Sequence, residues 1–89
     1  MMGMVDRMFR IEDEVARASS NPALAILNLI TLLEEDTIKK IPREVLGKIN
    51  FEDFDDEVFE CFDDLIRDYE TSNDDIVILG AIVEILLHN

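Results

Sequence analysis

The chain has 89 residues, of which 48% are hydrophobic, so it can build one core and is not a disordered segment of low hydrophobicity. A second domain would leave each half close to the roughly 40-residue minimum for unaided folding. Against 21 acidic residues stand only 8 Lys and Arg, which gives a net charge of −13. This charge argues against direct contact with nucleic acid or an anionic membrane surface, because both repel a polyanion.

Targeting signals are weak or missing in the sequence. No apolar run reaches the roughly 18 residues of a membrane span, and the first residues lack the basic and apolar segments of a secretory signal. The single cysteine, Cys61, excludes an internal disulfide and is consistent with a reducing compartment. These features predict a cytoplasmic protein without membrane contact.

The first two predicted elements are helices joined by a short turn. Residues 5–18 carry apolar side chains at helical spacing, at Met8, Ile11, Val15 and Ala18. The following turn contains an asparagine, which can cap a helix, and a proline suited to the first helical position. The second helix is expected over residues 23–35 and is apolar on nearly all sides.

The next two predicted elements differ sharply in charge. A short helix is expected to begin at Pro42 and end near Gly47. Residues 51–89 then carry 13 acids and one base, Arg67. Apolar residues at steps of three and four predict an amphipathic acidic helix over residues 52–70 rather than a disordered tail. Those apolar residues are Phe51, Phe54, Val58, Phe62, Leu65, Ile66 and Tyr69.

The last predicted helix covers residues 74–87. Ser72 and Asp75, three residues apart, fit a capping box at its start. Its β-branched residues could also form two short strands about Gly80, but no other segment offers a partner strand. We therefore expect an all-α fold, a small helical bundle of two helical hairpins with about four main helices and a short connecting helix.

A possible internal duplication links the two hairpins. Residues 21–30 align without gaps with residues 73–82, which sets Asn28 opposite Gly80. Such small or polar residues would suit a close helix approach or a buried amide. The alternative is that the two hairpins resemble each other only because each consists of an amphipathic helix followed by an apolar helix. That pattern alone produces such an alignment without a duplication.

The two apolar helices raise the question of what covers them. A helix that is apolar all round must be covered all round, and a bundle of this size hardly covers two. We therefore expect self-association, most simply as a two-fold dimer. The alternative is a compact core in which both helices lie centrally. The residues expected at the interface are Leu24, Leu27, Ile78, Ile82 and Ile85.

Motifs for catalysis are scarce. Glu57, Glu60 and Asp63 have a spacing that metal sites in helical proteins also use, but such sites need a second acidic or histidine-bearing helix. The only histidine, His88, stands next to the chain end, so Cys61 has no plausible histidine partner, and there is no glycine-rich loop. We expect no enzyme activity, no cofactor and no metal.

The acidic helix carries the expected function. Steps of three and four align four carboxylates along one side of it, away from the apolar stripe: Glu57, Glu60, Asp64 and Asp68. An unrelieved patch of one sign predicts a basic protein partner. The basic residues of the central connection are expected to offset the acidic helix within the fold or across a dimer: Lys39, Lys40, Arg43 and Lys48.

The predicted function is thus that of a small, non-catalytic interaction or regulatory protein, which self-associates and presents the acidic helix to a basic protein. An alternative is an inhibitor that imitates nucleic acid and occupies the basic site of a nucleic-acid-binding protein. A third hypothesis is an all-α metal-dependent nucleotide hydrolase.

Overall fold

Six helices build the fold in the computed structural model, which describes residues 4–88. No strand occurs within these residues, so the predicted all-α fold is confirmed. Residues 1–3 and residue 89 lie outside the described residues. The prediction that the first residues form no secretory signal therefore concerns, in part, residues that the structure does not describe. The helices are α1 (Met4–Arg17), α2 (Pro22–Ile30), α3 (Glu35–Lys39), α4 (Arg43–Asn50), α5 (Asp56–Arg67) and α6 (Asn73–Leu87).

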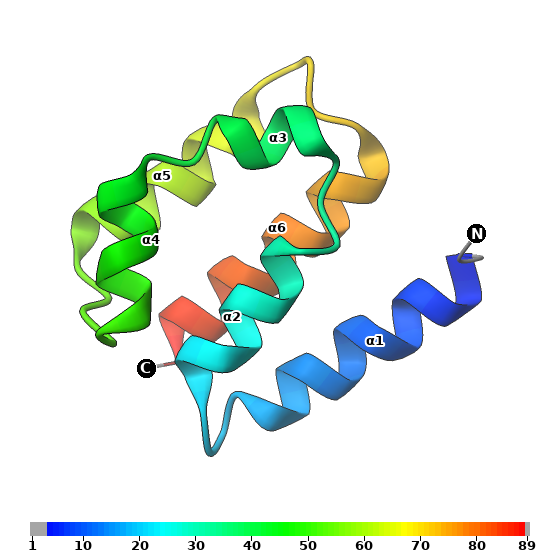
Figure 1. Ribbon diagram of the computed structural model, residues 1–89. Coiled ribbons are helices and arrows are strands. Elements are labelled where there is room, and N and C mark those ends of the chain that lie inside the picture. Colours follow the sequence, from blue (N-terminus) through cyan, green and yellow to red (C-terminus); the bar gives the residue numbers. More distant parts are fainter. Residues whose placement is uncertain (1–3, 89) are drawn as a thin grey trace.

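The apolar helices α2 and α6 pack against each other in the middle of the bundle. Helix α1 contacts both of them on one side, and α4 and α5 close the opposite side (Figure 1). The pairs α1–α2 and α5–α6 each pack as consecutive helices, which agrees with the two predicted hairpins. Within the described residues, no helix is both long enough and apolar enough to cross a membrane.

The core takes its largest side chains from both apolar helices. Ile26 and Leu29 of α2 and Ile78 and Ile82 of α6 are fully buried, together with Phe62 of α5. Burial of one such side chain contributes about 1.5–3 kcal/mol. The expectation that one chain hardly covers two apolar helices is therefore wrong for most of their length, because α1, α4 and α5 pack against α2 and α6; Leu24 of α2 and Val77 of α6 remain exposed.

The second predicted helix, residues 23–35, ends earlier than expected, and a short helix that was not predicted, α3, follows it. Helix α2 ends at Ile30, where the Thr31 hydroxyl donates to the Asn28 carbonyl oxygen at 2.6 Å. The chain restarts as α3 after Glu34, whose backbone N–H donates to Asp75 Oδ1 of α6 at 3.2 Å. The start of α3 therefore includes a contact with a distant residue, which periodicity within the segment cannot reveal.

The boundary between α4 and α5 also differs from the prediction. Helix α4 continues through Gly47 and ends at Asn50. Glu52 follows with φ of 58°. The N–H of Asp53 donates to the Lys48 carbonyl at 2.8 Å, and the N–H of Glu52 to the Ile49 carbonyl at 3.0 Å. This pattern is a Schellman motif, which usually uses glycine at the left-handed position.

The acidic helix is consequently shorter than residues 52–70. Asp55 caps α5 by accepting from the Val58 N–H at 3.2 Å, and Asp68 leaves the helix in an extended conformation. Three members of the predicted apolar stripe, Phe51, Phe54 and Tyr69, therefore lie outside α5, and Phe54 is half-buried. Phe51 and Tyr69 are 84% and 93% exposed, whereas Val58, Phe62 and Leu65 are buried.

The start of α6 matches the predicted cap in part. Ser72 Oγ accepts from the Asp75 N–H at 3.2 Å, but the Asp75 carboxylate binds α3 and its N-cap instead of returning to Ser72. Ser72 caps α6 whereas Asn21 caps α2, so the helix starts are displaced by one position in the proposed repeat alignment. A Cβ atom at Gly80 would meet nothing within 4 Å, so no close approach within the chain requires this glycine.

Candidate functional site: an acidic groove beside α5

A groove of about 380 Å³ runs between α5 and the segment that joins α3 to α4. Its floor and sides include the apolar groups of Pro42, Val45 and Leu65. The carboxylates that the sequence analysis placed on one side of the acidic helix all line this groove: Glu57, Glu60, Asp64 and Asp68. Lys40 and Cys61 complete the lining.

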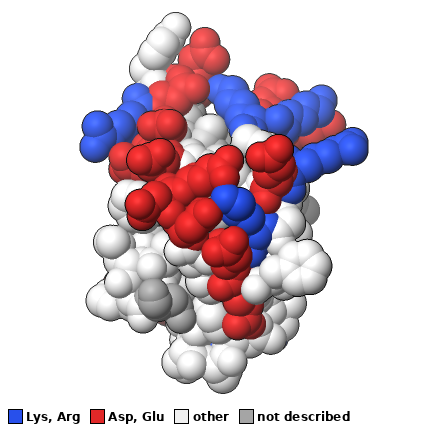
Figure 2. All heavy atoms as spheres, turned by 90° about the vertical axis from the view of Figure 1, so that its left-hand side faces the viewer, with Lys and Arg blue, Asp and Glu red and all other residues white. Residues whose placement is uncertain are grey.

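The same face carries most of its charge in one band. Figure 2 looks onto the side of the molecule with α4 and α5 and shows acidic side chains gathered across it, with a basic side chain inside the band and others along its upper edge. The lower end of this face is uncharged in the same view. The acidic side chains visible on this face are therefore gathered together rather than scattered.

One end of the acidic row is bound by a lysine from α4. Lys48 Nζ donates to Asp55 Oδ2 at 2.6 Å and also donates to Glu57. The hydrogen bonds to Asp55 and then Glu57 raise the pKa of Lys48 above its ordinary value of 10.5. In return, Lys48, followed by the Val58 backbone N–H, holds the pKa of Asp55 below its ordinary 3.8.

The other end is bound by a lysine that follows α3. Lys40 Nζ lies 3.2 Å from Asp68 Oδ2 and 3.7 Å from Glu70 Oε2. The hydrogen bond to Asp68 is the main cause of a raised pKa of Lys40. The Glu70 backbone N–H and then Lys40 lower the pKa of Asp68. The predicted role of the central basic residues, to offset the acidic helix within the fold, is confirmed for Lys40 and Lys48.

The middle of the row has no such partner. Glu60 and Asp64 are exposed, lie one helical turn apart on α5, and form no ion pair with any described residue. Cys61 lies half-buried beside them. Burial raises the pKa of the Cys61 thiol, and the charges of Asp64 and Glu57 raise it further. The thiol is therefore less reactive than an ordinary exposed cysteine at neutral pH.

One carboxylate of the predicted metal spacing is held in an ion pair. Asp63, the third carboxylate of the predicted metal spacing, points its Oδ2 to Arg67 Nε at 3.2 Å. Among the described residues, no three His, Cys, Asp or Glu side chains come together as a metal site. His88 is exposed at the end of α6, away from the residues that line the acidic groove.

The residues predicted for self-association divide between core and surface. Ile78, Ile82 and Ile85 are buried within the single chain, so they cannot contact a second copy while this fold is intact. Leu24 is 39% exposed and Leu27 is half-buried. A mainly apolar groove of about 580 Å³ lies instead between α1 and α6. Its apolar lining is Ile11, Val15, Ala16, Val77, Gly80 and Ala81, and Glu12 and Glu84 also line it.

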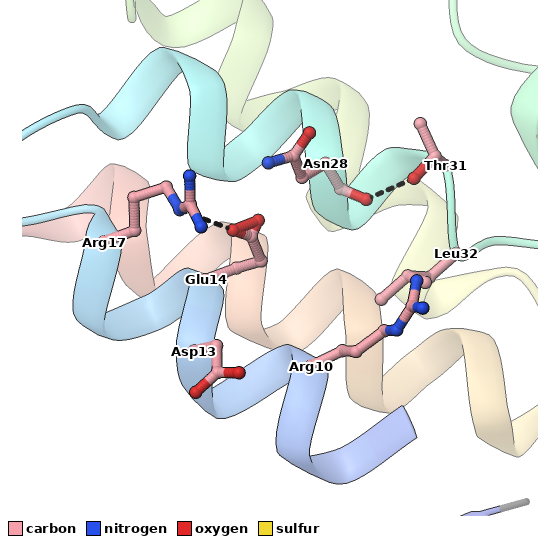
Figure 3. A pocket seen from close by; sticks show the side chains of 7 residues that line it. All are labelled: Arg10, Asp13, Glu14, Arg17, Asn28, Thr31 and Leu32. Carbon is pink, nitrogen blue, oxygen red and sulfur yellow. Dashed lines mark hydrogen bonds and ion pairs between the residues drawn. The ribbon is translucent and has the colours of Figure 1, made fainter. Parts of the chain in front are cut away.

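A polar pocket of about 270 Å³ lies between α1 and α2 (Figure 3). Glu14 is buried there and accepts from Arg17 Nε at 2.9 Å. Asn28 faces the same pocket from α2, and Arg10 extends from α1 toward Leu32. The two arginines are balanced by Asp13 and Glu14, so this pocket lacks the one-sided charge of the acidic groove.

The fold and the groove together define a small all-α protein with a carboxylate-lined, apolar-floored surface groove. Comparisons with protein-family models, with curated protein sequences and with solved structures find no match to this chain. The geometry of the groove is therefore the main indication of function.

Proposed function

We propose that the chain is a small, non-catalytic interaction protein whose acidic groove binds a basic segment of a protein partner. The observation that carries this proposal is the exposed Glu60–Asp64 pair, which forms no ion pair with a described residue and lies in a groove that Pro42, Val45 and Leu65 also line. Lysine and arginine side chains combine a cationic end with an apolar stem. Such a side chain can place its charge between Glu60 and Asp64 and its stem against Val45 and Leu65.

Electrostatics also favours this class of partner. A concentrated patch of one sign repels itself, and a basic partner relieves that repulsion on binding. The patch would also steer a basic partner from a distance, so the association rate should fall as salt screens the charges.

The experiment compares two double variants with the same change in charge. Glu60→Gln with Asp64→Asn neutralises the centre of the groove, whereas Glu44→Gln with Asp36→Asn neutralises exposed carboxylates that line neither this groove nor the one between α1 and α6. A synthetic lysine-rich peptide serves as the probe, and stopped-flow fluorescence measures its association rate at several salt concentrations. We expect the groove variant to bind more slowly and with a weaker salt dependence than the control variant. Equal losses in the two variants would contradict the proposal.

A nucleic-acid mimic is the narrower alternative, because carboxylates along a helix can approximate a row of phosphates. Glu57 and Asp68 are already bound to lysines of the chain, which supports the broader proposal over a continuous row of free charges. A mimic would compete with duplex DNA or RNA for a nucleic-acid-binding protein. A general interaction protein would bind its partner with or without nucleic acid.

We also propose that the chain self-associates, through the groove between α1 and α6. Val77 is 56% exposed beside this groove, and an open apolar surface of this kind is a common site of protein contact. The two surfaces are separate in residue composition, because the α1–α6 groove shares no lining residue with the acidic groove. A dimer formed there could leave the acidic groove open.

A further inference from the structure

Two lysines of the chain pair with the ends of the acidic row whose centre the proposed function assigns to a partner. Lys48 binds Asp55 and Glu57 at the start of α5, and Lys40 binds Asp68 and Glu70 beyond its end. Glu57 and Asp68 are 11 residues apart, which corresponds to about 16 Å along a helix. The chain's own ammonium groups therefore occupy both ends of the acidic row and leave its centre open.

Both lysines reach the row from a different part of the chain. Lys48 belongs to α4, and Lys40 follows directly after α3. Their side chains remain partly exposed, at 28% for Lys48 and 39% for Lys40. Ion pairs at such exposure are weak, because water competes for both charges and long side chains lose freedom when they pair. A stronger ligand can therefore exchange with them without unfolding the bundle.

We propose that Lys40 and Lys48 are internal competitors for the partner-binding groove, bound to its two ends in the free protein and displaced by the cations of a basic partner. This inference rests on the proposed function and concerns the regulation of the same site. The carboxylates that the lysines hold are Glu57 and Asp68, which are also two of the four groove residues.

The arrangement has a consequence for specificity. A ligand with one cation can bind the open centre at Glu60 and Asp64. It makes no additional contact with the carboxylates at the two ends, which the lysines hold. A ligand with several cations at the spacing of the row can bind the centre and replace both lysines, and each added contact is intramolecular after the first. The internal lysines thus select against singly charged ligands and favour a segment with clustered Lys or Arg.

The test uses two lysines of equal charge in different surroundings. Lys48→Gln removes an internal competitor, whereas Lys39→Gln removes an exposed lysine that pairs only with Glu35, outside the groove. Both changes make the net charge more negative by one unit, so their long-range effect on a basic probe is similar. Lys40→Gln is a second groove variant in case Lys48→Gln weakens the fold, which circular dichroism checks.

Isothermal titration calorimetry measures the affinity of each variant for the same lysine-rich peptide. We expect Lys48→Gln and Lys40→Gln to bind it roughly two- to fivefold more tightly than Lys39→Gln does, as expected for the loss of one exposed ion pair. Equal affinities in all three variants would overturn the internal competition while leaving the groove as the binding site. Absence of binding by the native chain and by every variant would overturn both proposals.

Discussion

The Thr37 hydroxyl of α3 donates a hydrogen bond of 2.6 Å to the Asp75 carboxylate of α6, although 38 residues separate the two in sequence. The other carboxylate oxygen of Asp75 accepts from the Glu34 N–H at 3.2 Å. Asp75 is fully buried, so it depends on these donors in place of water. The contact fixes α3 and the following Lys40 relative to α6.

Removal of the Thr37 hydroxyl should therefore destabilise the fold. Thr37→Val keeps the shape of the side chain but leaves one oxygen of Asp75 without its donor, which costs about 1–3 kcal/mol. Thr31→Val is the matched control, because the exposed Thr31 hydroxyl bonds to the Asn28 carbonyl and to no other group of the described residues. The free energy of unfolding of Thr31→Val should stay within about 0.5 kcal/mol of that of the native chain. Urea unfolding followed by circular dichroism measures both, and similar losses would contradict a special role for Asp75.

Gly80 should be replaceable with a gain in stability. It lies inside α6, and an added Cβ meets nothing within 4 Å, so Gly80→Ala should stabilise the single chain by about 0.5–1 kcal/mol. Gly47→Ala in α4 is the control, since its Cβ also meets open space. Thermal unfolding at low protein concentration compares them. A loss at Gly80 with a gain at Gly47 would point to a contact at Gly80 that the single chain does not make.

The ion pair of Lys48 with Asp55 should contribute to stability within a defined pH window. The lowered pKa of Asp55 means that its contribution is present above about pH 3.8 and is lost as the pH falls through its lower folded pKa. The raised pKa of Lys48 means that its contribution is lost only as the pH rises above 10.5, through its higher folded pKa.

The measurement is the difference in melting temperature between the native chain and Lys48→Gln. This difference should stay constant between about pH 5 and pH 9 and shrink at acidic pH, as Asp55 is protonated. Lys39→Gln corrects for the general effect of one removed charge on a chain that repels itself. A difference that grows toward acidic pH would have the wrong sign for this ion pair.

Cys61 should react slowly and report on the groove. Its raised pKa leaves less thiolate at neutral pH, so alkylation by iodoacetamide should be slower than for a small free thiol. Asp64→Asn removes one cause of the raised pKa and should accelerate the reaction, whereas Asp36→Asn, outside the groove, should not. Mass spectrometry follows the single cysteine directly. Equal rates in the two variants would show that the Asp64 charge does not reach the thiol.

Self-association should depend on Val77 more than on Leu24. Light scattering at micromolar concentration should detect a dimer of the native chain if the α1–α6 groove pairs with a second copy. Val77→Glu should give a folded monomer, because the side chain is already exposed in the single chain and the charge is costly only in an apolar interface. Leu24→Glu should leave the dimer intact. A native chain that is monomeric throughout would remove this proposal.

The sequence determined features that depend on neighbouring residues. Asn21 and Ser72 cap the helices that follow them, since a side-chain oxygen and the N–H three positions later are fixed by local geometry. The all-α fold follows from helical spacing throughout and from the lack of partner strands. The alignment of Glu57, Glu60, Asp64 and Asp68 along one side of α5 is likewise a property of helical steps.

Only the tertiary structure decided features that join distant segments. Asp75 accepts from the Glu34 N–H at the start of α3, and no local pattern around residue 34 predicts this donor–acceptor pair. The burial of Ile78 and Ile82 depended on whether other helices could cover α6. Lys40 and Lys48 came to bind opposite ends of the acidic row because the chain folds α4 and the end of α3 against α5. Helical periodicity orders side chains within one helix, but which helices meet depends on how the whole core packs.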